Sequence, residues 1–407
     1  MVRRRLILPF FFLCLVGAYA DWEDTYSDLI SIAGLDSNSG QNSFLTLLIP
    51  SGGKYQSMGT AYTAVALDAG YLESNPAASS HLQNTELTFY HNDWIDDSNL
   101  ESLAYTQRKG NIGWGIGAKF LWVPFEETNS WGETTDSGAY TETIMTFNGS
   151  YNLMGDYYYT GLSLGVNAKA AYRGISESLA EDQNALALMG DVGLLTQFNL
   201  LKFYPSRQKN CGFGLAVKNL GKEFITDPDP LPSRATAGLS YSPIKPLMLA
   251  FDATYPFNLN GEEAESMSYA MGMDVSMTDF LSMQGGFLLK LGKPRITMGS
   301  DLDLEKFSIG VNYTLDLTTQ FEPVDRITLS FSLNLGDFGR TTIRDKVQEL
   351  YLTGLGAYSQ GNYTQAIIYW EECLELDETF TPALEMIETT QKSLELEAKM
   401  REQQTVE

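Results

Sequence analysis

The sequence predicts an all-β transmembrane barrel of about 14 antiparallel strands, followed by a small all-α domain. Two observations carry this prediction: residues 84–336 alternate between apolar and polar or small side chains, and residues 341–407 have an acidic, helical pattern. A hydrophobic fraction of 43% and an aromatic fraction of 12% exclude a disordered chain. The net charge of −24 disfavours nucleic acid and anionic lipid headgroups as partners.

The first 20 residues have the three parts of a secretory signal peptide. Arg3, Arg4 and Arg5 form a basic start, Leu6–Val16 is apolar, and Ala18-Tyr19-Ala20 is a small-residue cleavage site. The apolar run is too short to span a bilayer as a helix. We expect residues 1–20 to be removed, although a buried N-terminal helix is the alternative. An exported chain without a predicted membrane helix is either periplasmic or an outer-membrane barrel.

The alternation in the middle region favours strands that face lipid on one side. In Phe307–Leu317 every odd position is apolar and every even position is small or polar. Such a pattern also fits a soluble sandwich. Three details favour lipid: runs of about ten residues, Tyr and Trp at the ends of the apolar faces, and mid-strand charges that all fall on the polar face. These charges are Lys119, Lys169, Lys218, Asp252, Asp274 and Asp316.

Fourteen candidate strands follow from this alternation. They lie near 84–91, 100–109, 111–123, 138–151, 157–172, 184–196, 211–220, 234–241, 247–256, 266–277, 280–290, 294–302, 307–317 and 325–336. An even number places both ends of the barrel on one side of the membrane. Short and long connections should then alternate, but residues 197–210 form a long connection where a short one is due, and 291–293 a short one where a long one is due. The sequence alone therefore leaves roughly 12 to 16 strands.

The segment before the first strand carries a small-residue stretch, Ser57–Gly70, and then Asn75-Pro76-Ala77. Its alanines predict a helix that stops at Gly70, and Asn-Pro predicts a turn. Together with the leader and the strands, this segment resembles the FadL/TodX family of outer-membrane transporters for long-chain fatty acids and other hydrophobic molecules. The residues that carry the resemblance are Gly59, Ala61, Ala66, Asp68, Ala69, Asn75, Pro76 and Ala77. The chain is also similar to the uncharacterised FadL-like bacterial family with a helical C-terminal extension.

The resemblance implies that residues 21–83 form an N-terminal extension and a hatch that plugs the barrel. Asn75, Pro76 and Ala77 would then be gate residues beside a kink in the wall, where ligand leaves sideways into the bilayer. Their chemistry permits this role, since Pro76 has a fixed φ and no N–H, Asn75 can bond nearby backbone, and Ala77 allows close approach to the wall. The alternative is that the three residues form only a packing turn.

The C-terminal region resembles one tetratricopeptide repeat. Gly354 lies in the first predicted helix, Gly361 and Tyr363 at the turn, and Ala366 and Trp370 in the second helix. The resemblance implies that these five residues pack two helices closely, with Pro382 starting a third; any amphipathic hairpin is the alternative. Because one repeat buries little surface, we expect it to dock on the barrel rim, a second copy or a periplasmic protein.

The sequence contains no pattern typical of catalysis or of cofactor binding. His81 and His91 are its two histidines, and neither lies in a hydrolase signature. We therefore predict no enzyme, catalytic residue, metal or cofactor. The resemblance implies passive uptake of long-chain fatty acids or other hydrophobic molecules across the outer membrane, with residues 341–407 in the periplasm. The alternatives are a general diffusion porin, or a surface adhesin or scaffold that the barrel anchors.

Overall fold

The computed structural model describes residues 42–94, 98–155, 157–176, 184–204, 208–224, 229–259, 266–290, 293–317 and 324–405. The predicted signal peptide, residues 1–20, and the first part of the predicted extension, residues 21–41, lie outside these ranges.

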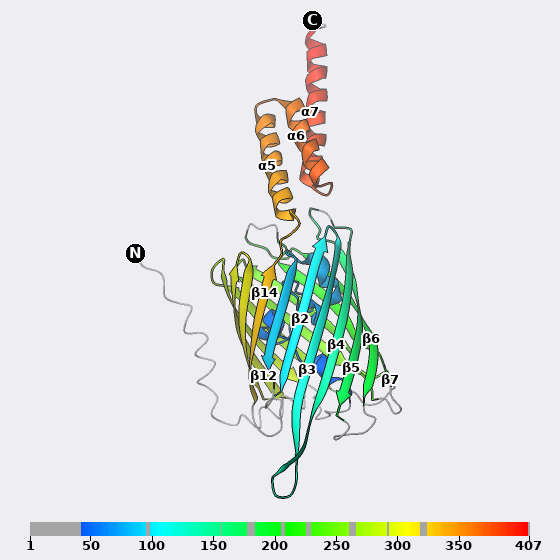
Figure 1. Ribbon diagram of the computed structural model, residues 1–407. Coiled ribbons are helices and arrows are strands. Elements are labelled where there is room, and N and C mark those ends of the chain that lie inside the picture. The colour runs from blue at the N-terminus through cyan, green and yellow to red at the C-terminus, as the bar shows by residue number, and fades with distance from the viewer. Residues whose placement is uncertain are drawn as a thin grey trace, which may run out of the picture.

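Fourteen antiparallel strands form a closed barrel, in which each strand pairs with its neighbours in sequence and β1 closes the sheet against β14 (Figure 1). The strands are β1 (Glu86–Asp93), β2 (Asn99–Lys109), β3 (Ile112–Thr128), β4 (Thr134–Leu153), β5 (Leu162–Ile175), β6 (Ala185–Phe198), β7 (Cys211–Phe224), β8 (Arg234–Ile244), β9 (Leu247–Pro256), β10 (Ser268–Ser276), β11 (Leu281–Lys290), β12 (Lys293–Leu304), β13 (Phe307–Asp316) and β14 (Val324–Asn334). The predicted barrel and its strand number are confirmed.

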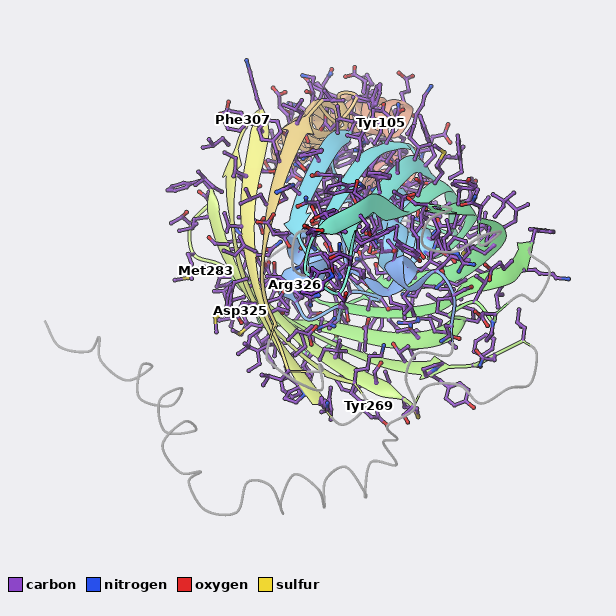
Figure 2. The ribbon with its side chains drawn as sticks, turned by 60° about the horizontal axis from the view of Figure 1, so that its bottom comes forward. Tyr105, Tyr269, Met283, Phe307, Asp325 and Arg326 are labelled. Atoms are coloured by element: carbon purple, nitrogen blue, oxygen red, sulfur yellow. The ribbon has the colours of Figure 1, made fainter. Side chains whose placement is uncertain are left out.

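The alternation in the sequence separates an apolar outer surface from a polar interior. Val166 is 57% exposed and Met283 48% exposed on the outside, whereas Arg326 is buried inside. Figure 2 shows Met283 outside the wall and Arg326 within it. The predicted lumenal charges are confirmed, because Lys119, Lys169, Lys218, Asp252, Asp274 and Asp316 are all buried in the interior. A mid-strand charge facing lipid would cost roughly 2–4 kcal/mol for Lys or Arg, and less for a carboxylate.

The two ends of the barrel differ. One end, here the helical end, carries the C-terminal helices, and at the other end β3 and β4 extend well beyond the wall (Figure 1). Both predicted exceptions to the alternation of loop lengths are present. At the helical end, β6 stops at Phe198 and β7 starts only at Cys211. At the opposite end, β11 stops at Lys290 and β12 starts at Lys293.

Residues 42–82, here the lumenal segment, run inside the barrel, where Figure 1 shows them in blue. They contain four short helices: η1 (Leu45–Leu48), α3 (Gly53–Ser57), α4 (Tyr71–Ser74) and η2 (Pro76–His81). The predicted helix over Ser57–Gly70 is wrong, and Gly70 precedes α4 rather than ending a helix. The physical reason is a break in the backbone: Gly59 and Thr60 both have positive φ, which a right-handed helix does not allow.

The C-terminal residues form three helices: α5 (Arg340–Ser359), α6 (Tyr363–Leu376) and α7 (Thr381–Thr405). α5 and α6 pack as a hairpin around Trp370, and the same apolar cluster includes Phe380, just before α7, and Ile387 of α7. Cys373 lies in this cluster, and burial raises the pKa of its thiol to about 11. Among the described residues, every helix falls short of the length and apolar character needed to cross a bilayer.

Polar and aromatic contacts join the helices to the barrel. The Arg340 guanidinium donates to the backbone oxygens of Leu82, at 3.1 Å, and of Gln83. Tyr158 donates to the Glu385 carboxylate at 3.0 Å, next to an edge-on contact between the Tyr157 and Phe380 rings. These contacts come from α5, from α7 and from Phe380, the residue before α7, so the helical domain touches the barrel at more than one point.

Candidate functional site

The lumenal segment packs closely against the inner wall, because the wall has glycine, which lacks a side chain, at the positions where the two meet. At ten lumen-facing glycines an added Cβ would come within 3.0 Å of an atom of the segment, which is closer than real Cβ atoms approach. We call these glycines the glycine belt: Gly113, Gly115, Gly165, Gly193, Gly212, Gly214, Gly238, Gly272, Gly286 and Gly299. They lie on β3, β5, β6, β7, β8, β10, β11 and β12, so the segment runs round much of the circumference.

Asn75, Pro76 and Ala77 lie together against β5 and β6, fully buried. The Asn75 amide nitrogen donates to the backbone oxygens of Thr63, at 2.7 Å, and of Leu194, at 2.9 Å. Its oxygen accepts from the Ala77 N–H at 3.1 Å. The Asn75 side chain thus forms hydrogen bonds with backbone groups of both the lumenal segment and the wall, and so attaches the segment to the wall.

The wall is irregular close to this contact. The β6–β7 register shifts at Asp191, between Gly190 and Val192. Asp191 is buried in the lumen, where its carboxylate accepts from the Asn219 N–H at 2.8 Å and pairs with Lys169 at 2.6 Å. A bulge of this kind bends a strand and raises its twist. This register shift lies three residues before Leu194, whose backbone oxygen accepts from Asn75.

One side-chain amide links the bulge to the lumenal segment. The Asn167 amide nitrogen on β5 donates to Asp191 at 2.8 Å and to the Leu72 backbone oxygen at 3.0 Å. Asn148 on β4 similarly donates to the Pro76 backbone oxygen at 2.9 Å. A displacement of the segment would break these bonds, so the segment and the irregular part of the wall are mechanically connected.

A cavity of about 530 Å³ lies in the lumen near the end opposite the helices. Its lining combines apolar side chains with five cationic side chains and two carboxylates. The apolar side chains are Leu45, Leu48, Ile49, Trp94, Leu121 and Leu288; the cationic ones are Lys218, Arg234, Lys290, Lys293 and Arg295; the carboxylates are Glu142 and Asp252. This basic lining contrasts with the chain's net charge of −24.

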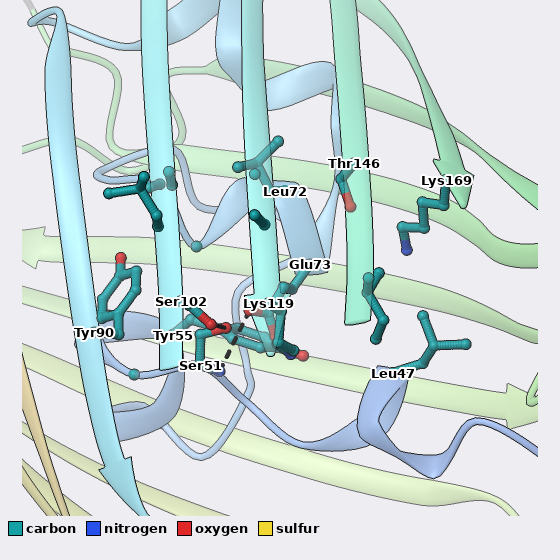
Figure 3. Close-up of a pocket in the computed structure, with 18 of the residues that line it drawn as sticks. Leu47, Ser51, Tyr55, Leu72, Glu73, Tyr90, Ser102, Lys119, Thr146 and Lys169 are labelled. Atoms are coloured by element: carbon teal, nitrogen blue, oxygen red, sulfur yellow. Dashed lines mark hydrogen bonds and ion pairs between the residues drawn. The ribbon is translucent and has the colours of Figure 1, made fainter. Parts of the chain in front are cut away.

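Next to this cavity, Lys119 and Glu73 form a partly buried ion pair with a nitrogen–oxygen distance of 3.1 Å (Figure 3). The Lys119 ammonium also donates to the Ile49 backbone oxygen at 2.6 Å, and Lys218 donates to the Glu73 backbone oxygen at 2.9 Å. Two barrel lysines therefore hold two parts of the lumenal segment, η1 and α4. Sequence reasoning placed both lysines in the lumen but did not identify Glu73 as a partner.

Of the five residues predicted to pack the repeat-like helices, Gly354, Ala366 and Trp370 lie in one cluster, whereas Gly361 lies at the turn and Tyr363 at the edge. A Cβ on Gly354 would overlap the Trp370 indole, whose N–H donates to the Tyr351 oxygen at 3.3 Å, and Ala366 is fully buried in the same cluster. Gly361 has φ +79° at the turn between α5 and α6. Tyr363 lies at the edge, with its ring 5.2 Å from that of Tyr358.

The two histidines make separate contacts. His81 in η2 bonds the Ser163 hydroxyl at 2.8 Å, and His91 on β1 lies 2.6 Å from Glu101. Within the described ranges, His, Cys, Asp and Glu side chains form no group of three that would hold a metal ion.

Both sequence and structure comparisons find known proteins that are similar to this chain. Residues 31–337 match an uncharacterised protein family, UPF0164. A UPF0164 protein of Treponema pallidum (strain Nichols) is 27% identical over 375 residues, which cover 89% of this chain and 85% of that protein. Among solved structures, the monoaromatic hydrocarbon channel CymD has a TM-score of 0.52 at 11% identity, covering 71% of this chain and 98% of that chain.

A FadL homologue of Pseudomonas aeruginosa has a TM-score of 0.45 at 11% identity, covering 70% of this chain and 99% of that chain. At such identities the CymD likeness concerns the fold, which agrees with the resemblance found in the sequence. The barrel resembles those of outer-membrane proteins, with apolar side chains outside and polar ones inside. The chain belongs to the UPF0164 family, and its barrel has the FadL-type fold.

Proposed function

We propose that this protein is an outer-membrane channel for passive uptake of hydrophobic molecules, and that long-chain fatty acids are its preferred ligands. The observation that carries the proposal is the cavity of about 530 Å³ near the end opposite the helices. The fold supports it, since CymD is a monoaromatic hydrocarbon channel of the same architecture. With the helical end in the periplasm, this cavity lies on the outer side of the membrane.

The lining of the cavity fits a molecule with an apolar chain and an anionic head. Leu48, Leu121 and Leu288 offer apolar contact, worth about 0.8 kcal/mol for each buried methylene group. Five cationic side chains against two carboxylates favour a carboxylate there, through charge-assisted hydrogen bonds. A neutral hydrocarbon would use the apolar contacts alone, so the basic lining selects the acid.

In the proposed cycle the lumenal segment is the hatch. A ligand in the cavity contacts Leu45, Leu48 and Ile49, which precede the belt contacts in the chain. Moving these residues strains the attachments of Asn75 and Pro76 to β6, next to the Asp191 bulge. Asn75, Pro76 and Ala77 then act as gate residues, and the ligand leaves sideways through the wall near β6 and β7.

The helical domain adds a second proposed role, contact with a periplasmic protein. Its hairpin packs around Gly354, Ala366 and Trp370 as a tetratricopeptide-like unit would. α7 extends the unit by 25 residues. In this proposal α5–α7 are held at the barrel rim by Arg340 and Phe380 and present their remaining surface to the partner.

The test of the gate is uptake of labelled fatty acid by liposomes that contain the full-length mature protein. In the double variant Asn75→Ala/Pro76→Ala the gate loses its side-chain bonds to the wall. We expect the initial uptake rate to fall about tenfold, as a change of about 1.4 kcal/mol in the barrier would produce. Asn129→Ala, at an exposed loop, is the matched control and should transport normally. Equal uptake by the double variant and the wild type would refute the gate.

The same assay separates the channel from a surface adhesin or scaffold. A chain that lacks residues 341–407 should still take up fatty acid if the barrel is the working part. Loss of uptake with an intact barrel would favour a role centred on the helices.

A further inference from the structure

A second cavity lies at the helical end of the lumen, where Gly53 and Lys54 of α3 line it. Its volume is about 560 Å³. Its charged lining consists of six carboxylates, from Asp68, Glu86, Asp279, Asp301, Asp303 and Glu305, and one ammonium, from Lys54. Its apolar lining includes Leu67, Tyr90, Phe280, Leu304 and Phe307, and Ser308, Ser330 and Ser332 add hydroxyls. This acidic cavity has the opposite polarity to the proposed fatty-acid site.

Asp301 indicates that the acidic cavity is a binding site rather than a solvated rim. Its side chain lines the cavity and is 93% buried, and its Oδ2 atom accepts no hydrogen bond from the described residues. A buried carboxylate without a partner is costly. Lys54, the one cation of the lining, makes no ion pair within 4.0 Å with a described carboxylate. A bound cation would supply the missing partner.

The arrangement of the carboxylates identifies the kind of cation. Within the described part of the chain, no three acidic side chains converge as a metal ion requires. The charges are instead distributed round a cavity that also has apolar walls, such as Tyr90 and Phe307. A ligand that fits carries several separated positive charges joined by short apolar spacers. We propose that the acidic cavity binds a linear polyamine, with its ammonium groups on the carboxylates and its methylene groups on the aromatic side chains.

Substitutions at two residues of the acidic cavity should change polyamine affinity in opposite directions. Asp301→Asn removes the negative charge of the carboxylate whose Oδ2 atom accepts no hydrogen bond from the described residues, so polyamine binding weakens. Lys54→Met removes the competing positive charge while keeping the length and apolar stem of the side chain, so binding strengthens. The gain in affinity of Lys54→Met distinguishes an electrostatic effect from misfolding, because a misfolded barrel would not bind the polyamine more tightly. The proposal is independent of fatty-acid uptake, since it concerns binding at the other end of the lumen.

The test is calorimetric titration of spermidine into the detergent-purified full-length protein at low salt. We expect saturable binding, at least tenfold weaker in Asp301→Asn and several-fold tighter in Lys54→Met. Asp325→Asn, at an exposed carboxylate on β14 outside the cavity, is the control and should bind as the wild type does. Mg²⁺ at the same concentration should displace little spermidine.

Four results would overturn the proposal: no saturable binding, an Asp301→Asn affinity equal to that of the control, weaker binding by Lys54→Met, or displacement of spermidine by equimolar Mg²⁺. Folding of each variant is checked by the shift in gel mobility on heating. If Asp301→Asn fails to fold, the Lys54→Met affinity decides the question.

Discussion

Replacing Gly193 by valine is expected to open the barrel to ions. A Cβ at this position would overlap the Asn75 amide oxygen and lie 2.7 Å from Pro76 Cδ, so the lumenal segment cannot keep its place against β6. Overpacking of this kind costs about 1–3 kcal/mol. The buried amide of Asn75 would also lose its partners, at a further cost of about 1–3 kcal/mol. In planar bilayers we expect a large, steady single-channel conductance from the variant and a much smaller one from the wild type.

Two glycines provide the control for this experiment. Gly149 on β4 and Gly285 on β11 have open space where a Cβ would lie. Their valine variants add the same volume to other strands of the wall without touching the segment, and they should conduct as the wild type does. A wild-type channel that already conducts like an open pore would instead support the general diffusion porin.

Trp370→Ala is expected to unfold the helical domain while leaving the barrel intact. Trp370 is fully buried between α5, α6 and α7, and removing a buried Trp costs about 3–5 kcal/mol. A unit of three helices has little stability to spare. Limited proteolysis should therefore cut residues 341–405 in the variant but not in the wild type, while the barrel keeps its mobility shift on heating. Leu352→Ala, at an exposed position of α5, is the control, and equal protease resistance of all three proteins would contradict this account.

The barrel was predictable because its pattern is local. Each strand must alternate with a period of two to face lipid on one side and the lumen on the other, and Phe307–Leu317 shows this without reference to any other strand. The buried charges followed from the same rule, since Lys169 and Asp252 lie on the polar face. The resemblance to the FadL/TodX family added the expected fold, which CymD supports.

The bulge was missed although the sequence carries a signal for it. In β7 the apolar outward positions are odd at Phe213, Leu215 and Val217, but even at Leu220 and Phe224. This change of phase at Lys218 and Asn219 shows that one extra residue is accommodated there, opposite Asp191. A search for a continuous alternation ends the strand at such a point rather than detecting a bulge.

The course of the lumenal segment was not predictable, because it depends on contacts across the barrel. Asn75 meets Leu194, 119 residues later in the chain, and Tyr62 meets Asp252, 190 residues later. The alanines of Ser57–Gly70 indicated a helix, yet the segment packs tightly against Gly214 and Gly286, and the positive φ of Gly59 interrupts the helix. Tertiary contact here overrides local propensity.

The central claim is that the lumenal segment must move for a ligand to pass. Ser51 in the lumenal segment and Ser102 on β2 allow a direct test, because their hydroxyl oxygens lie 2.8 Å apart and both line a cavity, so two cysteines in their place can reach the S–S bond length of about 2.0 Å. The variant Ser51→Cys/Ser102→Cys would carry Cys211→Ala and Cys373→Ala, which remove the two native thiols of the described residues.

Fatty-acid uptake by liposomes is then measured with the bridge oxidised and after reduction. If the segment moves, oxidised protein transports little and reduction restores the rate, while the single variant Ser102→Cys is insensitive to the redox state. Uptake at the same rate by the oxidised and reduced double-cysteine protein, with the disulfide verified by mass spectrometry, would contradict the account.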